Sequence, residues 1–254
     1  MKTLAVIPAR YASTRFPGKP LALLGGKPII DYVYHTAAAT EGIDRAVVAT
    51  DDERILNHMH TTFGPASAMM TSPSHRSGTD RCGEVAATLA AQGEHYDVVI
   101  NLQGDEPFVQ PQQLQSLAQC FAQHQEVKIA TLRTPIGTTD ELLSPNNVKV
   151  VCAATGNALY FSRQPLPYLR GVDVGEWLAQ GSYYKHVGIY AFRPDTLATL
   201  CALAPGTLEE SEKLEQLRWL EAGFAIYVCD TAMANIGIDT PDDLAAAERY
   251  LQNR

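Results

Sequence analysis

The chain has 254 residues, of which 46% are hydrophobic and 19% are charged, and its formal net charge at pH 7 is −8. This composition is typical of a globular protein rather than a disordered one, and a chain of this length buries about 70–75% of its extended surface. The negative charge disfavours binding to DNA or RNA, because an acidic protein and a phosphate backbone repel each other.

Targeting and membrane signals are weak in this sequence. No apolar run approaches the roughly 18 residues that cross a bilayer, and the opening "MKTLAVIPAR" lacks the long apolar stretch and cleavage pattern of a secretory signal. The five cysteines are odd in number and never spaced C-x-x-C, which favours free thiols in a reducing compartment. We therefore expect a cytoplasmic protein without a membrane partner.

The first half of the chain alternates short β-branched segments with alanine-rich helical patterns. Buried strands are predicted at residues 3–7, 45–50, 66–70, 97–102 and 128–134. Helices are predicted between them, at residues 27–40, 51–60, 77–92 and 111–124. This alternation predicts an α/β fold with a mostly parallel, Rossmann-like sheet flanked by helices on both faces. Ligands bind such sheets beyond the carboxyl ends of the strands, where the loops described below should gather.

Helix boundaries carry recognisable signals. Pro28 and Pro111 stand where a first helical position tolerates proline, and Ser77 with Asp80 resembles an N-terminal cap. Near the C-terminus Thr240 is the expected cap of a helix over residues 240–251, with Asp243 completing a capping box.

The alternation of strand and helix patterns becomes less regular after about residue 145. Residues 148–171 resemble a hairpin-like excursion, residues 183–192 another strand and residues 208–223 a helix, while residues 165–182 have no clear period. No repeat or linker separates independent folding units. We expect a single domain over residues 1–254, with a smaller irregular inserted region at about residues 152–205.

The loop after the first strand, "IPARYASTRFPGKP" at residues 7–20, is rich in cations. Arg10, Arg15 and Lys19 accompany small residues such as Ser13, which leave successive backbone N–H groups uncovered. Such groups form an anion-binding nest, and three cations around it suit a polyphosphate. The loop matches neither the P-loop nor the dinucleotide fingerprint. The alternative is a solvated surface loop.

Two aspartates stand at positions suited to a hard cation. Asp105 follows a predicted strand in "NLQGDEP", and Asp239 precedes a helix in "NIGIDTPDDL". Mg²⁺ usually takes one or two protein carboxylates together with phosphate oxygens. Each aspartate also has a structural alternative, a Gly-Asp turn for the first and a favourable charge at a helix N-terminus for the second.

Further polar residues are scattered through the second half of the chain. His186 and Tyr190 are four residues apart and therefore face the same side of a regular strand. Taken alone, a single histidine is more often structural than functional, and Glu215 with Gln216 has the pattern of a solvated helix face.

Eight segments together resemble a known family. They occur in order across nearly the whole chain: "IPARYASTRFPGKPL", "VATDD", "SGTDR", "NLQGDEP", "ALYFSR", "KHVGIYAF", "KLEQLR" and "GIDTPDDL". The series resembles the CMP-Kdo synthetases, which are the 3-deoxy-manno-octulosonate (Kdo) cytidylyltransferases of lipopolysaccharide synthesis. The first segment alone also fits the wider group of sugar-acid cytidylyltransferases, including the CMP-sialate synthetases.

The resemblance implies a nucleotidyltransferase fold and a reaction. The anomeric hydroxyl of Kdo attacks the α-phosphate of CTP, pyrophosphate leaves and CMP-Kdo forms, with two Mg²⁺ ions as cofactors. It also implies a CTP site, made of Arg10, Ser13, Arg15 and Lys19 at the triphosphate and of Thr50, Asp51, Ser77, Gly78, Thr79, Arg81 and Gln103 around the nucleoside.

The remaining implied roles concern the metal, the sugar and the oligomer. Asp105 and Asp239 match the family's Mg²⁺ ligands and, with Arg10, Arg15 and Lys19, form the expected catalytic set. The sugar acid would be held by Gln103, Arg163, His186, Tyr190, Glu215 and Gln216. The family is typically homodimeric, with the irregular middle region as the expected contact.

Substrate choice within the family has its own markers. A related branch activates an 8-amino analogue of Kdo and carries different residues where Glu106 and Gly237 stand here. The chain keeps the Kdo-like residue at both positions, which favours Kdo itself.

Three other classes of protein remain as alternatives. A CTP-sensing protein would need the cation-rich loop but not paired aspartates. An NAD-dependent oxidoreductase is disfavoured by the missing glycine fingerprint. A nucleotide-sugar glycosyltransferase is disfavoured because it binds a diphosphate, whereas the cluster at residues 10–19 suits a triphosphate.

Overall fold

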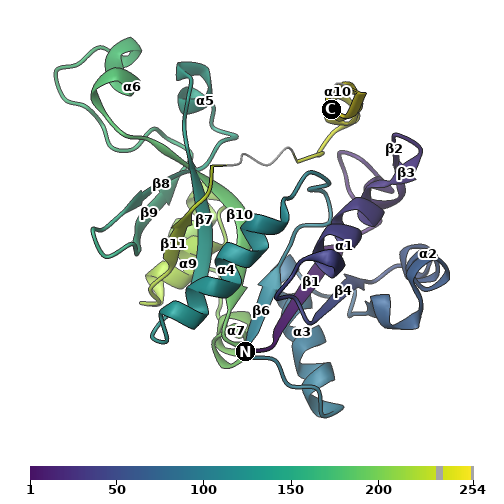
Figure 1. The fold of residues 1–254 in the computed structure, drawn as a ribbon. Coiled ribbons are helices and arrows are strands. Elements are labelled where there is room, and N and C mark those ends of the chain that lie inside the picture. The colour runs from purple at the N-terminus through teal and green to yellow at the C-terminus, as the bar shows by residue number, and fades with distance from the viewer. Residues whose placement is uncertain (233–236, 253–254) are drawn as a thin grey trace.

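The computed structural model describes residues 1–232 and 237–252. Within these residues nine strands form one sheet in the order β11-β7-β10-β6-β1-β4-β5, with β8 paired to β10 and β9 paired to β8 (Figure 1). The strands are β1 (Thr3–Ala9), β4 (Arg45–Thr50), β5 (Ala68–Met70), β6 (Val98–Asn101), β7 (Ile129–Pro135), β8 (Lys149–Cys152), β9 (Ala158–Ser162), β10 (Tyr184–Phe192) and β11 (Tyr227–Asp230).

The pairing of these strands confirms the predicted mostly parallel α/β sheet. β1 pairs in parallel with β4 and β6, β4 with β5, and β7 with β11. β10 is the antiparallel exception in the path, because it runs between β6 and β7. β1 therefore has a strand on each side and delivers its carboxyl end to the middle of one sheet edge.

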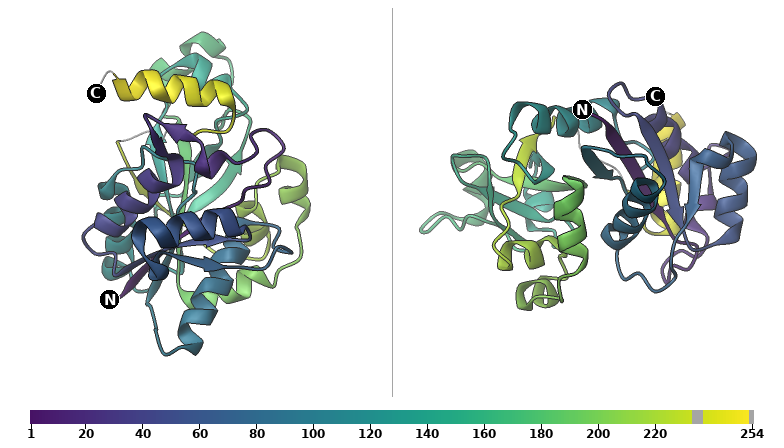
Figure 2. Two further views of the ribbon diagram at one scale, coloured as in Figure 1. Left: turned by 90° about the vertical axis from the view of Figure 1, so that its right-hand side faces the viewer. Right: turned by 90° about the horizontal axis from the view of Figure 1, so that it is seen from below.

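Both faces of the sheet are covered, as the side chains of β1 show. Ala5 and Ile7 belong to a core with α1 (Ile29–Ala39), α2 (Glu53–Phe63) and α4 (Pro111–Gln123). Leu4 and Val6 belong to a second core with α3 (Gly78–Ala91), α7 (Pro194–Cys201) and α9 (Gln216–Glu221). Because successive strand side chains point to opposite faces, a strand buried on both sides is apolar throughout. Figure 2 shows the two helix layers in turned views.

The last helix returns to the start of the chain. α10 (Pro241–Gln252) lies beside the short hairpin of β2 (Leu23–Leu24) and β3 (Lys27–Pro28), and Leu24, Ile29 and Ala247 share a third, smaller core (Figure 1). This packing brings the residues just before α10 to the carboxyl ends of β1 and β6.

The predicted signals at helix starts are confirmed with one correction. Ser77 and Asp80 form a capping box, Thr240 and Asp243 exchange cap hydrogen bonds, and Pro111 is the first residue of α4. Pro28 lies one residue earlier than expected, as the N-cap of α1, because it pairs with Leu23 in the β2–β3 hairpin.

The helix predicted over residues 208–223 is wrong as a single element. The structure has α8 (Thr207–Glu212) and α9, separated at Lys213, whose φ of 54° is left-handed. In a continuous helix Glu212 and Glu215 would share one face. Instead Glu212 accepts a hydrogen bond from Ser162 on β9, and Glu215 accepts one from Thr79 on α3. Contacts to two different elements require the break.

The stretch expected as an insertion, at about residues 152–205, only partly leaves the central sheet. β10 within it pairs with both β6 and β7. The part without clear sequence period contains η3 (Val174–Glu176) and α6 (Trp177–Gln180) and packs around Trp177 and Tyr183, together with Leu142 of α5 (Thr139–Leu143). The short η1 (Lys19–Leu21) and η2 (Pro65–Ser67) complete the described elements.

Candidate functional site

A cavity of about 430 Å³ lies at the carboxyl ends of β1 and β6. Four segments form its walls: the loop after β1, the loop after β6, the start of α3 and the residues just before α10. Nine of the predicted site residues line it, namely Arg10, Ser13, Arg15, Lys19, Gly78, Arg81, Gln103, Asp105 and Asp239. The fold thus gathers the predicted triphosphate loop and both predicted metal ligands in one place.

The cation-rich loop is folded back on itself by backbone contacts. The Gly18 N–H donates to the Tyr11 carbonyl at 2.8 Å, and Gly18 has a left-handed φ of 73°. A Cβ at this position would lie 3.0 Å from the Tyr11 ring. The Arg54 guanidinium is 3.3 Å from the centroid of that ring and is itself bound by Asp52, the cap of α2. The loop is therefore anchored to the helix after β4.

Lys19 joins the two aspartates. Its Nζ is 2.5 Å from Asp105 Oδ2 and 3.0 Å from Asp239 Oδ1, and Arg15 lies 3.3 Å from the second Asp239 oxygen. Burial alone would lower the pKa of Lys19, but the two carboxylates outweigh it and raise the pKa above 10.5. The lysine is charged at physiological pH.

Backbone contacts hold Asp105 and Asp239 in reach of one another. The Ile238 N–H donates to the Asp105 carbonyl at 2.9 Å. A Cβ at Gly104 would stand 2.8 Å from the Pro8 carbonyl, so the loop after β6 approaches β1 as closely as only glycine permits. The first residues of the "NIGIDTPDDL" segment, 235 and 236, lie outside the described residues.

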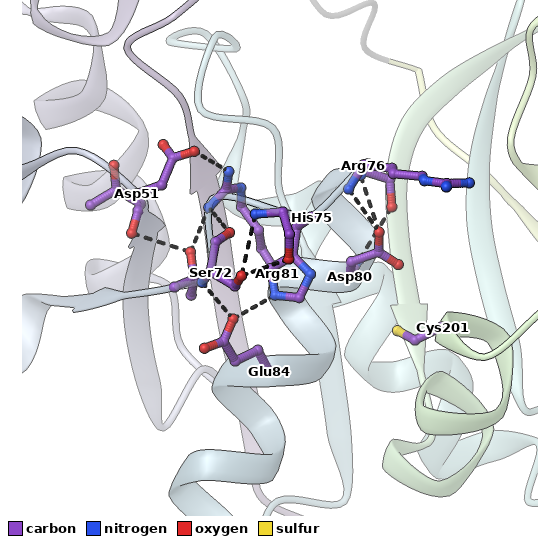
Figure 3. Close-up of polar contacts among 12 residues, drawn as sticks. Asp51, Ser72, His75, Arg76, Asp80, Arg81, Glu84 and Cys201 are labelled. Carbon is purple, nitrogen blue, oxygen red and sulfur yellow. Dashed lines mark hydrogen bonds and ion pairs between the residues drawn. The ribbon is translucent and has the colours of Figure 1, made fainter.

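Arg81 is buried beside the cavity and pairs with Asp51 at the end of β4 (Figure 3). One terminal nitrogen lies 2.6 Å from Asp51 Oδ2, and the other donates to the Thr71 hydroxyl at 2.6 Å. Its Nε is buried and has no hydrogen-bond partner among the described residues. Thr50 is also fully buried, so it supports this wall rather than lining the cavity.

Part of the predicted sugar-binding set lies beside the start of α3. Thr79 donates its hydroxyl proton to Glu215 at 2.8 Å. Burial raises the pKa of Glu215, and hydrogen bonds from Ser77 and Thr79 act in the opposite direction. The Tyr190 hydroxyl is buried without a partner among the described residues, and burial with the nearby Glu215 charge raises its pKa. Gln216 is buried next to Glu215 in the chain.

His186 and Arg163 occupy different surroundings. Burial lowers the pKa of His186 to about 3, and its Nε2 lies 2.9 Å from the Thr131 hydroxyl. It lines a smaller cavity of about 260 Å³ together with Glu106. The Arg163 guanidinium donates to the carbonyls of Glu212 and Pro145 at 2.8 and 2.9 Å and lines neither cavity. The structure therefore places the Arg163 guanidinium on backbone carbonyls and outside both cavities.

A larger cavity of about 510 Å³ is lined in part by residues that precede α3, such as His75 and Arg76, which Figure 3 labels. His75, Glu84 and Cys201 line it, and His75 and Glu84 bind each other at 2.5 Å. None of the predicted site residues lines it. We assign the site to the cavity of about 430 Å³ because the three cations and both carboxylates line it.

Comparison with known proteins shows the family of this chain. A family model described as Cytidylyltransferase matches residues 4–228. The chain belongs to the cytidylyltransferase family. It is 50% identical to a 3-deoxy-manno-octulosonate cytidylyltransferase of Bacteroides thetaiotaomicron and 48% identical to that of Parabacteroides distasonis, with both chains of each pair covered completely.

Solved structures agree with this assignment. The structure of CMP:2-keto-3-deoxy-manno-octonic acid synthetase complexed with CTP is 40% identical, with a TM-score of 0.89, and the match covers 100% of this chain and 99% of that one. A 4-diphosphocytidyl-2C-methyl-D-erythritol synthase, 15% identical with a TM-score of 0.65, shares the fold. The resemblance drawn from the eight segments is confirmed, and the chain is an enzyme of this family.

Some residues at the candidate site have no recognisable signal in the sequence. Thr71 accepts from Arg81, and Asn101 holds the Gln103 amide through a contact of 3.2 Å. The Arg10 guanidinium donates to the His75 carbonyl, which ties the cation-rich loop to the residues before α3. The "VATDD" segment is a signal for the Asp51 and Asp52 contacts, but no spacing points to Thr71 or Asn101.

The donor set at the cavity suits a hard divalent cation bound together with a nucleotide. Among the described residues no group of three or more histidine, cysteine or acidic side chains is placed to hold a metal. Asp105 and Asp239 supply two carboxylates, which matches the pattern of Mg²⁺, an ion that completes its shell with water and phosphate oxygens.

Proposed function

We propose that this cytidylyltransferase transfers the cytidylyl group from CTP to the anomeric hydroxyl of Kdo, releasing pyrophosphate and forming CMP-Kdo for lipopolysaccharide synthesis. The observation that carries the proposal is the cavity in which Arg10, Arg15 and Lys19 face Asp105 and Asp239. Cations for a triphosphate beside carboxylates for a divalent ion are what nucleotidyl transfer requires.

The triphosphate would lie between the cation-rich loop and the N-terminus of α3. Arg10 and Arg15 can grip phosphate oxygens, while the Gly78 backbone opens a helix whose dipole favours anions. The nucleoside would extend toward Arg81, whose buried Nε has no hydrogen-bond partner among the described residues. Lys19 would then neutralise the charge that develops on the leaving pyrophosphate.

Mg²⁺ belongs to the proposal, with Asp105 and Asp239 as its protein ligands. When bound, two ions would shape the triphosphate and make the attacking hydroxyl more acidic. The chain itself contributes position and charge: the anchored loop holds the α-phosphate, and Gln103 is fixed by Asn101 at the sugar side of the cavity.

The sugar acid would occupy the space between the cavity and β10. Tyr190 offers a buried hydroxyl without a described partner, and Glu215 lies close enough to affect its pKa. His186 stays neutral at physiological pH because of its lowered pKa, so it can share a hydrogen bond without adding charge. Arg163 would have to leave its carbonyl partners to bind the sugar carboxylate.

We further propose a homodimer located in the cytoplasm. Exposed apolar side chains surround the region that packs on Trp177, including Tyr168, which is 71% exposed, and Val174, which is 43% exposed. A second copy would cover them. The five cysteines are free thiols, which is typical of a reducing compartment.

The test is pyrophosphate release with CTP and Mg²⁺ when Kdo, 8-amino-Kdo and sialic acid are offered in parallel. We expect release with Kdo. Release with another sugar acid alone would keep the nucleotidyl transfer and refute the substrate. CTP binding without release from any of the three would favour the CTP-sensing alternative.

A further inference from the structure

The ammonium of Lys19 lies where two carboxylates from distant parts of the chain meet. It contacts Asp105 at 2.5 Å and Asp239 at 3.0 Å, and its side chain is only 12% exposed. Asp239 also forms an ion pair with Arg15, whose guanidinium nitrogen lies 3.3 Å from Asp239 Oδ2. These are the same carboxylates that the proposed function assigns to the divalent ion.

We propose that Lys19 is a tethered counter-ion that positions Asp105 and Asp239 in the nucleotide-free enzyme and excludes a divalent ion until the triphosphate draws the ammonium away. The proposal rests on the proposed function for the identity of the two ligands. It adds that metal affinity in this enzyme depends on nucleotide, and it names the residue that creates the dependence.

The electrostatic argument starts from the carboxylates. Two like charges held close together repel each other, and a cation between them removes that cost. A free divalent ion would have to displace an ammonium that is covalently attached and largely shielded from water. Asp105 and Asp239 are then satisfied without metal, so metal binding alone yields little net interaction.

A triphosphate changes this balance. Lysine carries a compact charge on a flexible stem, and Lys19 starts η1 directly after the left-handed Gly18, inside the loop that faces the cavity. Phosphate oxygens placed on this loop offer the ammonium a new anionic partner within reach of the same stem. Both aspartates then become available to a cation that also binds the phosphates.

This exchange is a linkage between two ligands. If nucleotide favours metal binding through Lys19, metal must favour nucleotide binding by the same factor. Couplings of this kind typically amount to about 5–150-fold in affinity. Removing the positive charge of Lys19 should therefore strengthen metal binding in the absence of CTP and reduce the coupling.

The experiment measures Mn²⁺ binding to nucleotide-free protein by the loss of the free-ion electron paramagnetic resonance signal. Lys19→Met keeps most of the side-chain volume without the charge, and we expect it to bind Mn²⁺ at least about tenfold more tightly than the unmodified enzyme. Lys19→Arg keeps the charge and should bind as weakly as the unmodified enzyme. Lys27→Met, at an exposed lysine on β3, is the matched control and should change nothing.

A double variant shows where the ion binds. Adding Asp105→Asn to Lys19→Met should abolish the gained affinity, and thermal unfolding of every variant checks that each is folded. Equal Mn²⁺ affinity in the unmodified enzyme and folded Lys19→Met would overturn the role of Lys19. Pyrophosphate release that needs no divalent ion would instead refute the metal part of the proposed function, so the two failures are distinguishable.

Discussion

At the scale of single residues, Glu215 is held between opposing influences. Burial favours its protonated form, while hydrogen bonds from Thr79 and Ser77 favour the carboxylate, and the outcome is a raised pKa. A group whose pKa is higher in the folded state binds more protons there. Its contribution to stability is complete below the ordinary value of 4.5 and is lost as the pH rises through the raised pKa.

The raised pKa of Glu215 predicts how the stability of Glu215→Gln depends on pH. The variant keeps the shape but cannot lose a proton, so its free energy of unfolding relative to the unmodified enzyme should increase from about pH 4 to neutral pH. Urea unfolding at both pH values measures the difference. A difference that stays constant with pH would mean that burial does not perturb this carboxyl group.

Asp239 permits a test of the metal assignment at the same scale. Asp239→Asn should lower turnover about a hundredfold or more while leaving CTP binding, measured without divalent ion, nearly intact, because the lost charge acts mainly on the reacting phosphate. Steady-state kinetics and calorimetric titration with CTP separate the two effects. Asp242→Asn, at an exposed neighbour in the first turn of α10, should behave as the unmodified enzyme.

The opposite pattern for Asp239→Asn would contradict the assignment. If CTP binding collapsed while turnover at saturation stayed normal, Asp239 would be a nucleotide-binding residue and not a metal ligand.

At the scale of elements, the conformation of the cation-rich loop depends on Gly18. Gly18→Ala combines a left-handed backbone, which costs an alanine about 1–2 kcal/mol, with a contact of 3.0 Å to Tyr11. If about 1.4 kcal/mol of this is lost from the organisation of the loop, the KM for CTP rises roughly tenfold.

Gly26→Ala is the matched control for the loop prediction. Gly26 also has a positive φ, of 85°, but nothing lies within 4 Å of a Cβ built there. Both variants should lose similar thermal stability, whereas only Gly18→Ala should raise the KM for CTP. An equal KM in both variants would show that the loop tolerates displacement of Tyr11.

At the scale of the whole molecule, the region around Trp177 is the proposed contact between two copies. Tyr168 is mostly exposed and stacks edge-on against Trp177, so it can be changed without opening the core of the sheet. Tyr168→Asp would place a charge in the proposed interface and should shift the enzyme from dimer to monomer in sedimentation velocity. A monomeric unmodified enzyme, or a variant that remains fully dimeric, would contradict this contact.

Much of the architecture follows from local patterns. The alternating apolar segments predict the strands and helices of the first half, since each pattern reports which side chains that segment must bury. Cap signals such as Ser77 with Asp80 place helix starts, because they involve residues only three apart. Local patterns also explain the wrong prediction of one long helix through Lys213. The helix breaks where Glu212 contacts Ser162 and Glu215 contacts Thr79, and these partners are too remote in the sequence for a local pattern to report.

The sequence by itself determined the sheet type, the cation-rich loop, the two aspartates and, through eight ordered segments, the family. Only the tertiary structure decided which charges face one another. Lys19, Asp105 and Asp239 meet because parallel strands end at one edge and α10 packs back on the β2–β3 hairpin. The same packing left Arg163 bound to carbonyls. Local spacing encodes the burial of single segments, whereas a site built from segments over 200 residues apart depends on how those segments pack.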